Sequence, residues 1–339
     1  MKKQLLLLPL LTWFAYCSAQ FDSNTISIMF YNTENFFDPA DDTLKNDDSY
    51  TIEGMNRWSY KKMYHKRDQI AKVILSINQW NPPDIIGLAE IENDVVLKSL
   101  IRHPGLQKNG YKFIHYESPD SRGIDVAMLY RERTCQILEA FPIPVVFPLE
   151  PGSKNRDILY AKVKVKTGDT LHLFVNHWTS RFGGAGATIS KRNFYAFMVK
   201  EKVDSLLAEN AFAHIVIMGD FNDYPTDHSV YTVLEAQEPK EPYPRLINMM
   251  LPFHSFQNEG THKNEAFWGC LDQMILSRSF FLEKSCWKIP KKILIYKPEF
   301  LLVPDEKFGG TKPFRTFLGF KYLGGFSDHL PILLILEAK

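Results

Sequence analysis

The distribution of apolar residues along the chain predicts mostly short β-strands separated by turns. Short, continuous apolar runs are typical of strands that are buried on both faces. Runs of this kind occupy residues 25–31, 84–89, 111–116, 124–130, 158–165, 171–175, 215–218, 271–276 and 332–336. The polar and acidic residues 38–56 follow the first run, and we expect them to form an ordered surface loop.

Three other segments show the helical period instead. In residues 60–80, apolar side chains recur three and four positions apart, and two prolines at positions 82 and 83 end the pattern. Residues 93–102 and 188–209 are the other predicted helices, and Thr188 or Ser190 is the expected cap of the last one. No glycine- or proline-rich linker divides the chain, so we expect two packed sheets with helices outside them, in one domain of residues 22–339.

The first residues have the pattern of a secretory signal peptide. Two lysines precede an apolar run over residues 5–16, and small residues follow it. We therefore expect residues 1–19 to be removed after Ala19 and the protein to be exported, to the periplasm or the extracellular space. A lipid anchor at Cys17 is a poorer alternative because Tyr16 is bulky for the preceding position. This run is too short for a membrane-spanning helix, and no later stretch is apolar enough for stable membrane insertion.

Charge and cysteine content narrow the class of protein. The chain has 40 basic and 39 acidic residues, and without the two lysines at positions 2 and 3 the balance is 38 against 39. Binding of long nucleic acid by charge alone needs a strongly basic protein, so a nucleic-acid substrate would have to enter a local groove with a bound metal. The remaining cysteines, Cys135, Cys270 and Cys286, are odd in number and fit no zinc or redox motif by spacing. A bridge between Cys270 and Cys286 is the minor alternative to free thiols.

Polar residues at the ends of several predicted strands point to chemistry. A core does not tolerate such groups without partners. They are Asn32, Glu90, Asn176, His177, Asp220, Asn222 and Asp272. Singly, each has an ordinary explanation: a turn cap, a surface carboxylate, a buried histidine or an ion pair with lysine. Asp220 and Asn222, however, are two apart, so an extended chain places both on one face, with the oxygen donors that Mg²⁺ prefers.

The chain also contains a characteristic series of short motifs. In order they are Asn-Phe-Phe-Asp, Ala-Glu-Ile-Glu-Asn, Asn-His-Trp, Gly-Asp-Phe-Asn, Leu-Asp-Gln and Ser-Asp-His. This series resembles the endonuclease/exonuclease/phosphatase superfamily, which includes deoxyribonuclease I, apurinic endonucleases, neutral sphingomyelinases and inositol polyphosphate 5-phosphatases. The resemblance covers nearly all of residues 22–339. It implies an α/β fold, a four-layer α/β/β/α sandwich of two packed mixed or antiparallel sheets flanked by helices, with the site where the strand ends of both sheets meet.

The resemblance also implies a metal site. Glu90 would be the principal carboxylate ligand, helped by Asn32 and Asp328. The implied ion is Mg²⁺, with Mn²⁺ or Ca²⁺ as alternatives. Such an ion neutralises the charge of a phosphodiester and keeps open positions for substrate oxygen and water.

The catalytic groups implied by the resemblance surround the same phosphate. Asp220 and Asn222 would hold and polarise the attacking water or a second metal ion. His329, hydrogen-bonded to Asp272, would be a general acid/base or a phosphate contact, because an aspartate behind a histidine fixes its tautomer and raises its pKa. His177 would face the phosphate from the other side.

Four further residues are candidate contacts to substrate phosphate. They are Arg122, Arg181, Arg315 and Asn176. The planar guanidinium group of arginine suits phosphate, although a solvated surface position is the ordinary alternative for each of the three arginines. Arg181 is favoured because a short loop ties it to His177. The sequence departs from the usual superfamily pattern at Gln273 and Ala89, which affect neighbours of the site rather than its ligands.

These observations predict an exported, metal-dependent phosphodiesterase, most specifically an endonuclease with nucleic acid as its substrate and no protein partner. The alternative is a phospholipid or inositol-phosphate hydrolase, suggested by the apolar residues 141–147, which could touch a membrane as a hairpin but are better explained as an internal strand. A third hypothesis is an inactive binding module that keeps the fold. It is disfavoured because every expected catalytic position carries a chemically suitable residue.

Overall fold

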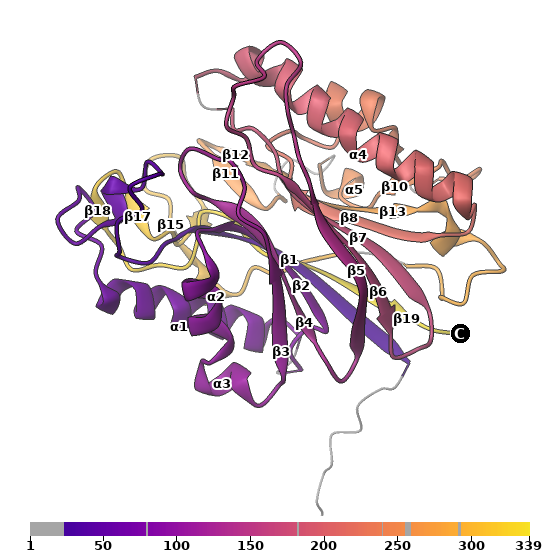
Figure 1. The fold of residues 1–339 in the computed structure, drawn as a ribbon, viewed down its shortest axis with the longest axis horizontal. Coiled ribbons are helices and arrows are strands. Elements are labelled where there is room, and N and C mark those ends of the chain that lie inside the picture. Colours follow the sequence, from indigo (N-terminus) through magenta and orange to yellow (C-terminus); the bar gives the residue numbers. More distant parts are fainter. Residues whose placement is uncertain (1–23, 79–80, 182, 239, 255–258, 291–292) are drawn as a thin grey trace, which may run out of the picture.

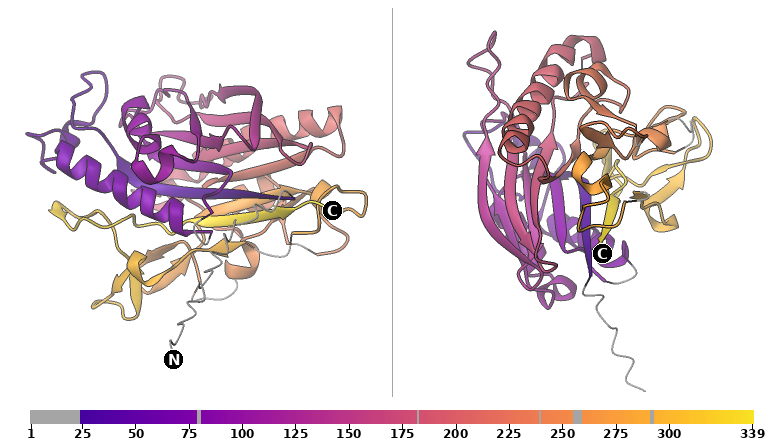
Figure 2. Two further views of the ribbon diagram at one scale, coloured as in Figure 1. Left: turned by 90° about the horizontal axis from the view of Figure 1, so that it is seen from below. Right: turned by 90° about the vertical axis from the view of Figure 1, so that its right-hand side faces the viewer.

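Two mixed β-sheets packed face to face form the centre of the molecule (Figures 1 and 2). The computed structural model describes residues 24–78, 81–181, 183–238, 240–254, 259–290 and 293–339. The six strands of the first sheet are, in spatial order, β14 (Leu294–Ile295), β19 (Ile332–Glu337), β1 (Thr25–Phe36), β2 (Ile85–Ile91), β4 (Asp125–Arg131) and β3 (Tyr111–His115). The seven strands of the second are β5 (Cys135–Ile143), β6 (Ile158–Val165), β7 (Thr170–His177), β8 (His214–Asp220), β13 (Asp272–Ser277), β10 (Leu246–Asn248) and β9 (Ala236–Gln237).

Helices cover the two outer faces of this pair of sheets. Figure 1 shows α1 (Tyr60–Ser76), α2 (Asp94–Ile101) and α3 (Pro104–Gln107) on one side and α4 (Ile189–Glu209) on the other. The predicted four-layer sandwich is therefore confirmed. The shorter helical turns are η1 (Asp48–Tyr50), η2 (Ala185–Thr188), η3 (Ser229–Val233), α5 (Leu251–His254), η4 (Arg278–Phe281) and η5 (Glu299–Leu301). Three small hairpins complete the fold: β11 (His262–Asn264) with β12 (Phe267–Gly269), β15 (Leu302–Pro304) with β16 (Thr311–Pro313), and β17 (Phe317–Leu318) with β18 (Lys321–Tyr322).

Each predicted strand and helix corresponds to an element of the structure. The first strand is longer than predicted, because β1 continues through polar residues to Phe36. Thr188 occupies the cap position of α4, but its hydroxyl donates to the Ser180 carbonyl and accepts from the Arg192 guanidinium instead of capping a backbone N–H of the helix. The predicted signal peptide, including Cys17, lies outside the described residues, as do residues 79–80 at the end of the first predicted helix. None of the described helices is long and apolar enough to cross a bilayer.

Two apolar clusters hold the layers together. The larger fills the space between the sheets and extends to the buried face of α1. The smaller lies between the second sheet and α4, where Val199 and Val203 are buried. Complete burial of an aliphatic side chain contributes about 1.5–3 kcal/mol, so the inner face of α4 fixes this helix on its sheet.

The apolar residues 141–147 follow the interpretation that the sequence favoured, an internal strand, over the alternative of a membrane-touching hairpin. Phe141 and Ile143 belong to β5 and pair with β6. Val145 and Phe147 are buried, and the Phe147 ring packs against Tyr195 of α4. Pro144 and Val146 are the exposed residues of this run. The apolar character of the segment is explained by internal packing.

The cysteines of the described chain are free thiols. Cys135 and Cys270 are buried, whereas Cys286 is exposed. The alternative of a bridge between Cys270 and Cys286 is therefore not realised in this structure.

Gly219 allows β7 and β8 to approach closely beside the ends that carry polar residues. A Cβ atom at this position would lie 2.4 Å from the backbone oxygen of Asn176. Because backbone cannot swing aside, we expect Gly219→Ala to lower the free energy of unfolding by about 1–3 kcal/mol, measured by denaturant titration. Gly152→Ala is the matched control, since nothing lies within 4 Å of its Cβ. Equal midpoints for both variants would contradict this packing.

Candidate active site

A cavity of about 510 Å³ opens where the carboxyl ends of β1, β2, β7 and β8 meet. Within each sheet the two strands are parallel neighbours, so their polar carboxyl ends lie at one edge. The cavity is lined by Glu34, Asn35, Glu90, Arg122, Arg156, His177, Ser180, Arg181, Asp220, Asn222, Tyr224, His262, Asn264, Leu271, Asp328 and His329. Residues predicted from positions far apart in the sequence are thus brought together in one place.

Two hydrogen bonds hold the Asp220 carboxylate in place. Its two oxygens accept hydrogen bonds from the Asn222 backbone N–H at 2.9 Å and from Asn32 Nδ2 at 3.0 Å. Burial raises the pKa of Asp220 to about 6, and the neighbouring Asp272 carboxylate adds to this effect while His329 opposes it. Such a group is a carboxylate at neutral pH and can still accept a proton readily.

His329 and Asp272 form the expected pair. His329 Nδ1 lies 2.7 Å from Asp272 Oδ2, and its Nε2 lies 3.8 Å from the nearer Asp220 oxygen. Burial by itself lowers the pKa of His329, but the Asp272 and Asp220 carboxylates outweigh burial and raise it well above the ordinary value. The imidazole is therefore protonated at neutral pH and can donate a proton into the cavity.

His177 has the opposite protonation state. Its Nε2 lies 3.7 Å from an Asp220 oxygen and 3.9 Å from a Glu90 oxygen. Burial and the nearby Arg156 and Arg122 guanidinium groups hold the pKa of His177 well below its usual value. This histidine is neutral, and within the described part of the chain its Nδ1 atom has no hydrogen-bond partner.

Three carboxylates gather on the side of the cavity that belongs to the first sheet: Glu34, Glu90 and Asp328. Burial and the Asp328 charge raise the pKa of Glu34 to about 7, although Lys66 and Arg315 oppose the shift. Arg315 donates to Glu34 Oε1 at 3.2 Å and to Asp328 Oδ2 at 2.9 Å. Crowded carboxylate oxygens are the donor set of a hard divalent cation. Glu34, Glu90 and Asp328 therefore have the donor chemistry of the predicted metal site. Among the described residues, however, the ligand atoms that lie within 4.8 Å of one another at this cavity are those of His262, Asp328 and His329 and those of Asp220, Asp272 and His329.

The backbone around the cavity is strained. Glu34, Asn35, Glu90 and Asn222 all have positive φ angles between 49° and 61°. Residues other than glycine rarely adopt this conformation, which costs about 1–3 kcal/mol each and is concentrated at functional sites. The surrounding sandwich must supply the stability that keeps these side chains in place.

The three predicted arginines differ in how many hydrogen bonds their guanidinium groups already make within the protein. Arg181 donates through Nε to the Asn222 carbonyl and through Nη2 to Asp223 and Asp227, so it mainly fixes the loop that carries Asn222. Arg315 neutralises the carboxylates described above. Arg122 also lines the cavity, and its only hydrogen bond from the side chain, among the described residues, goes to Asn35 Oδ1.

Four of the predicted site residues do not line the cavity: Asn32, Asn176, Asp272 and Arg315. Asn176 is completely buried and uses its side chain for the Met218 carbonyl and the Trp178 indole N–H. Asn32 lies behind Asp220, with its Oδ1 atom accepting the Glu34 backbone N–H. We therefore withdraw Asn176 as a phosphate contact, and we assign Asn32 to the orientation of Asp220 rather than to the metal.

Sequence reasoning missed several cavity residues. Glu34 follows Asn32 at the same two-residue offset as Asn222 follows Asp220, but its positive φ angle, which the sequence does not reveal, accompanies its place in the cavity. His262, from the β11–β12 hairpin, packs its ring 4.9 Å from that of His329. Arg156 donates hydrogen bonds to the carbonyls of His177 and Trp178 and so stabilises the end of β7. Nothing in the local sequence marks these last two.

Comparisons with known proteins agree with this geometry. A model of the "Endonuclease/Exonuclease/phosphatase family" matches residues 27–338. Among solved structures, D. rerio TDP2 humanized by 14 mutations is 15% identical, with a TM-score of 0.57 over 93% of this chain and 99% of that one. D. rerio TDP2 complexed with a single-strand DNA product is 16% identical, with a TM-score of 0.55 over 93% and 99%.

A mannosyl-6-phosphatase of Bacteroides thetaiotaomicron is also similar, with 18% identity and a TM-score of 0.55 over 92% of this chain and 99% of that one. No curated protein sequence matches the chain. At these identities the solved structures establish the fold and leave the substrate open.

Proposed function

Because the chain belongs to the endonuclease/exonuclease/phosphatase family, a family of phosphoester hydrolases, we propose that it is a divalent-metal-dependent phosphodiesterase that cleaves nucleic acid. One observation carries the proposal. Asp220, a carboxylate that can accept a proton, and His329, a histidine that can donate one, line the same cavity. Further carboxylates in that cavity offer the oxygen donors that a divalent metal ion needs. In-line displacement at phosphorus needs these same three elements.

The residues divide the chemistry between them. Asp220, held by two hydrogen bonds, orients a water molecule and accepts its proton. His329, supported by Asp272, gives a proton to the departing oxygen or to the phosphate. Neutral His177 offers a hydrogen bond to the phosphate without adding charge. A metal ion held by Glu90, Glu34 and Asp328 would supply charge neutralisation.

Features at the rim support nucleic acid as the substrate. The Arg181 guanidinium lies 4.2 Å from the centre of the Tyr224 ring, which stacks on His254 at 5.2 Å. Flat aromatic and guanidinium surfaces beside a phosphate site can hold an unpaired base. The DNA product in the similar TDP2 complex agrees with this choice. Export is part of the proposal, and it rests on the sequence of residues 1–19 alone.

A substrate panel tests the function. The purified protein would be incubated with plasmid DNA, single-stranded DNA, RNA, sphingomyelin, an inositol phosphate and mannose 6-phosphate, each with Mg²⁺ and with excess chelator. We expect cleavage of nucleic acid that chelator abolishes and added Mg²⁺ restores. Turnover of a lipid, inositol or sugar phosphate alone would overturn the nucleic-acid assignment, and turnover in chelator would overturn metal dependence.

Arg122 is the expected contact to substrate phosphate. Loss of a hydrogen bond from a charged group costs about 1.5–3 kcal/mol, so Arg122→Ala should raise KM about 10- to 100-fold. We expect a smaller change in kcat, because Arg122 does not transfer a proton. Steady-state kinetics on a short oligonucleotide would measure both. Arg102→Ala, at the exposed end of α2, is the control. An unchanged KM for Arg122→Ala would contradict this role.

A further inference from the structure

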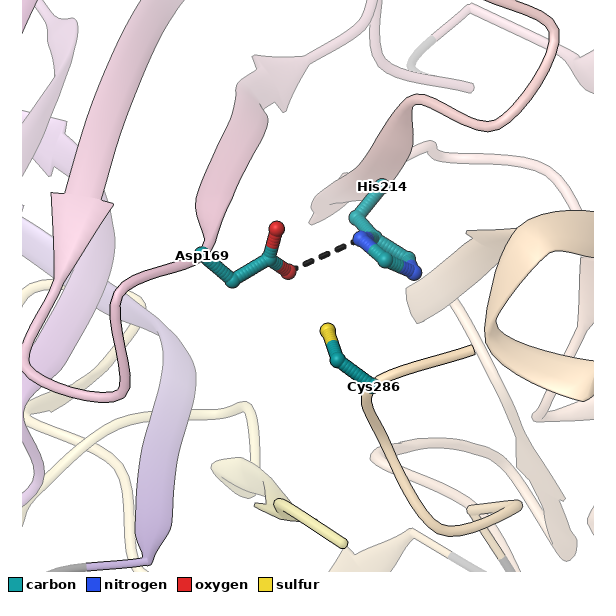
Figure 3. A group of neighbouring side chains, drawn as sticks. All are labelled: Asp169, His214 and Cys286. Carbon is teal, nitrogen blue, oxygen red and sulfur yellow. Dashed lines mark ion pairs between the residues drawn. The ribbon is translucent and has the colours of Figure 1, made fainter. Parts of the chain in front are cut away.

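A second group of ligand-type side chains lies at the other end of β7 and β8 (Figure 3). Asp169 lies in the turn before β7, His214 is the first residue of β8, and Cys286 lies in the loop between η4 and β14. One ligand atom from each lies within 4.8 Å of the others. Figure 3 shows the Cys286 thiol pointing into the space beside the Asp169–His214 ion pair.

His214 and Asp169 pair with each other, and Ser285 and Trp287 hold the two side chains from outside the group. His214 Nδ1 lies 2.8 Å from Asp169 Oδ2, and His214 Nε2 lies 3.2 Å from the Ser285 hydroxyl. Trp287 Nε1 donates to the same Asp169 oxygen at 2.5 Å. Metal-binding histidines and carboxylates usually have such partners, which fix the ring and the oxygen that face the ion. Cys286 is exposed, which leaves an entry path from solvent.

We propose that Asp169, His214 and Cys286 form a second metal site, which binds a divalent transition metal such as Zn²⁺. A thiolate, an imidazole and a carboxylate are its typical ligands, and a water molecule would complete the tetrahedron. Mg²⁺ and Ca²⁺ prefer oxygen donors alone and would not compete strongly for the thiolate. On binding, the Cys286 thiol loses its proton to solvent.

This site is separate from the cavity described above and does not depend on its proposed function. Parallel pairing aligns Leu171 with His214 at one end of these strands and His177 with Asp220 at the other. Along β8 the six-residue step from His214 to Asp220 spans about 20 Å. The second ion would therefore take no part in phosphoester hydrolysis.

Its effect would be to fasten the last part of the chain to the second sheet. The Cys286 carbonyl accepts the backbone N–H of Lys339, and Trp287 forms a bridge with Ala338. A ligand that binds only the folded state stabilises it by mass action. Zn²⁺ should therefore raise the melting temperature of this protein, and Mg²⁺ should not reproduce the increase at this site.

Cobalt substitution tests the site with a readout other than activity. Thiolate coordination gives Co²⁺ an intense charge-transfer band in the near ultraviolet, and among the described residues that line the active-site cavity there is no cysteine. The full chain, freed of metal, would be titrated with Co²⁺ at about 10 µM protein and then with Zn²⁺, which should displace the cobalt. We expect a band that saturates at one equivalent.

Variants make the assignment specific. Cys286→Ser should abolish the band and the stabilisation by Zn²⁺, and His214→Gln should weaken both, while hydrolytic activity in Mg²⁺ stays at the wild-type level. Cys135→Ser removes a thiol elsewhere and should keep the band. Absence of the band in the wild type, its persistence in Cys286→Ser, or its loss in a folded Cys135→Ser would overturn the proposal. Circular dichroism establishes that each variant is folded.

Discussion

Asp220→Asn should lower kcat by about 10³-fold or more, the largest effect we expect from a single substitution. An amide cannot accept the proton that Asp220 takes from water. Because both oxygens of Asp220 accept hydrogen bonds, the new NH₂ group would also face a donor, either the Asn222 backbone N–H or Asn32 Nδ2. This mismatch costs about 1–3 kcal/mol of stability, so thermal unfolding must be measured beside single-turnover kinetics.

Two further variants separate chemistry from folding. Asn32→Ala removes one of the two donors that orient Asp220 and keeps the carboxylate, so we expect an intermediate loss of kcat. Asp204→Asn, in a surface ion pair with Arg245, should leave both activity and stability unchanged. A folded Asp220→Asn protein that retains a tenth of the wild-type rate would rule out Asp220 as the base.

Asp272→Asn should displace the basic limb of the pH–rate profile to lower pH. Burial lowers the pKa of His329, and the Asp272 carboxylate is the largest of the contributions, with those of Asp220 and Asp328, that together raise it. Without that charge the pKa falls, so His329 loses its proton, and the rate declines, at a lower pH than in the wild type. We expect a displacement of about 1–2 pH units for one neighbouring charge. At neutral pH the rate should fall by about 10²-fold, and His329→Ala should remove this limb entirely.

The control is a similar pair outside the cavity. His115 Nε2 lies 3.3 Å from Asp125 Oδ2, both groups are buried, and burial opposes but does not prevent a raised pKa of His115. Asp125→Asn should perturb stability and leave the shape of the pH–rate profile unchanged. If Asp272→Asn lowers the rate without moving the basic limb, His329 acts by position and not as an acid.

The sequence was most informative where strand periodicity and local polarity agreed. Asp220 and Asn222 could be recognised because they follow an apolar run, although Asn222 lies beyond the end of β8 with a positive φ angle, so the extended-chain rule does not account for its orientation. The same rule excludes Asn176, since adjacent residues of a strand point to opposite faces and His177 takes the cavity side. Glu34 lines the cavity while Asn32, two residues earlier, does not, because the positive φ angle of Glu34 interrupts the alternation of an extended strand.

Other features depend on which strands become neighbours, which no local pattern encodes. Arg156, two residues before β6, donates a hydrogen bond to the His177 carbonyl. The His262 ring packs against that of His329 from a separate hairpin. The spacing of Cys286 fits no zinc motif in the sequence, yet parallel pairing of β7 and β8 brings Asp169 and His214 to it. Sequence-based expectation therefore succeeds for elements and single site residues and fails for contacts between distant segments.

Hydrogen bonds between the two sheets make the activity depend on both sheets being packed together. Asn32 of the first sheet holds Asp220 of the second, and Asp272 of the second holds His329 beside the first. Fragments made by cutting the turn between β4 and β5 would each carry an incomplete set of groups, and turnover would return only when they reassociate. The enzymatic rate therefore reports whether the two sheets are packed together. In a denaturant titration, we expect activity to be lost at the same concentration at which the sheets separate.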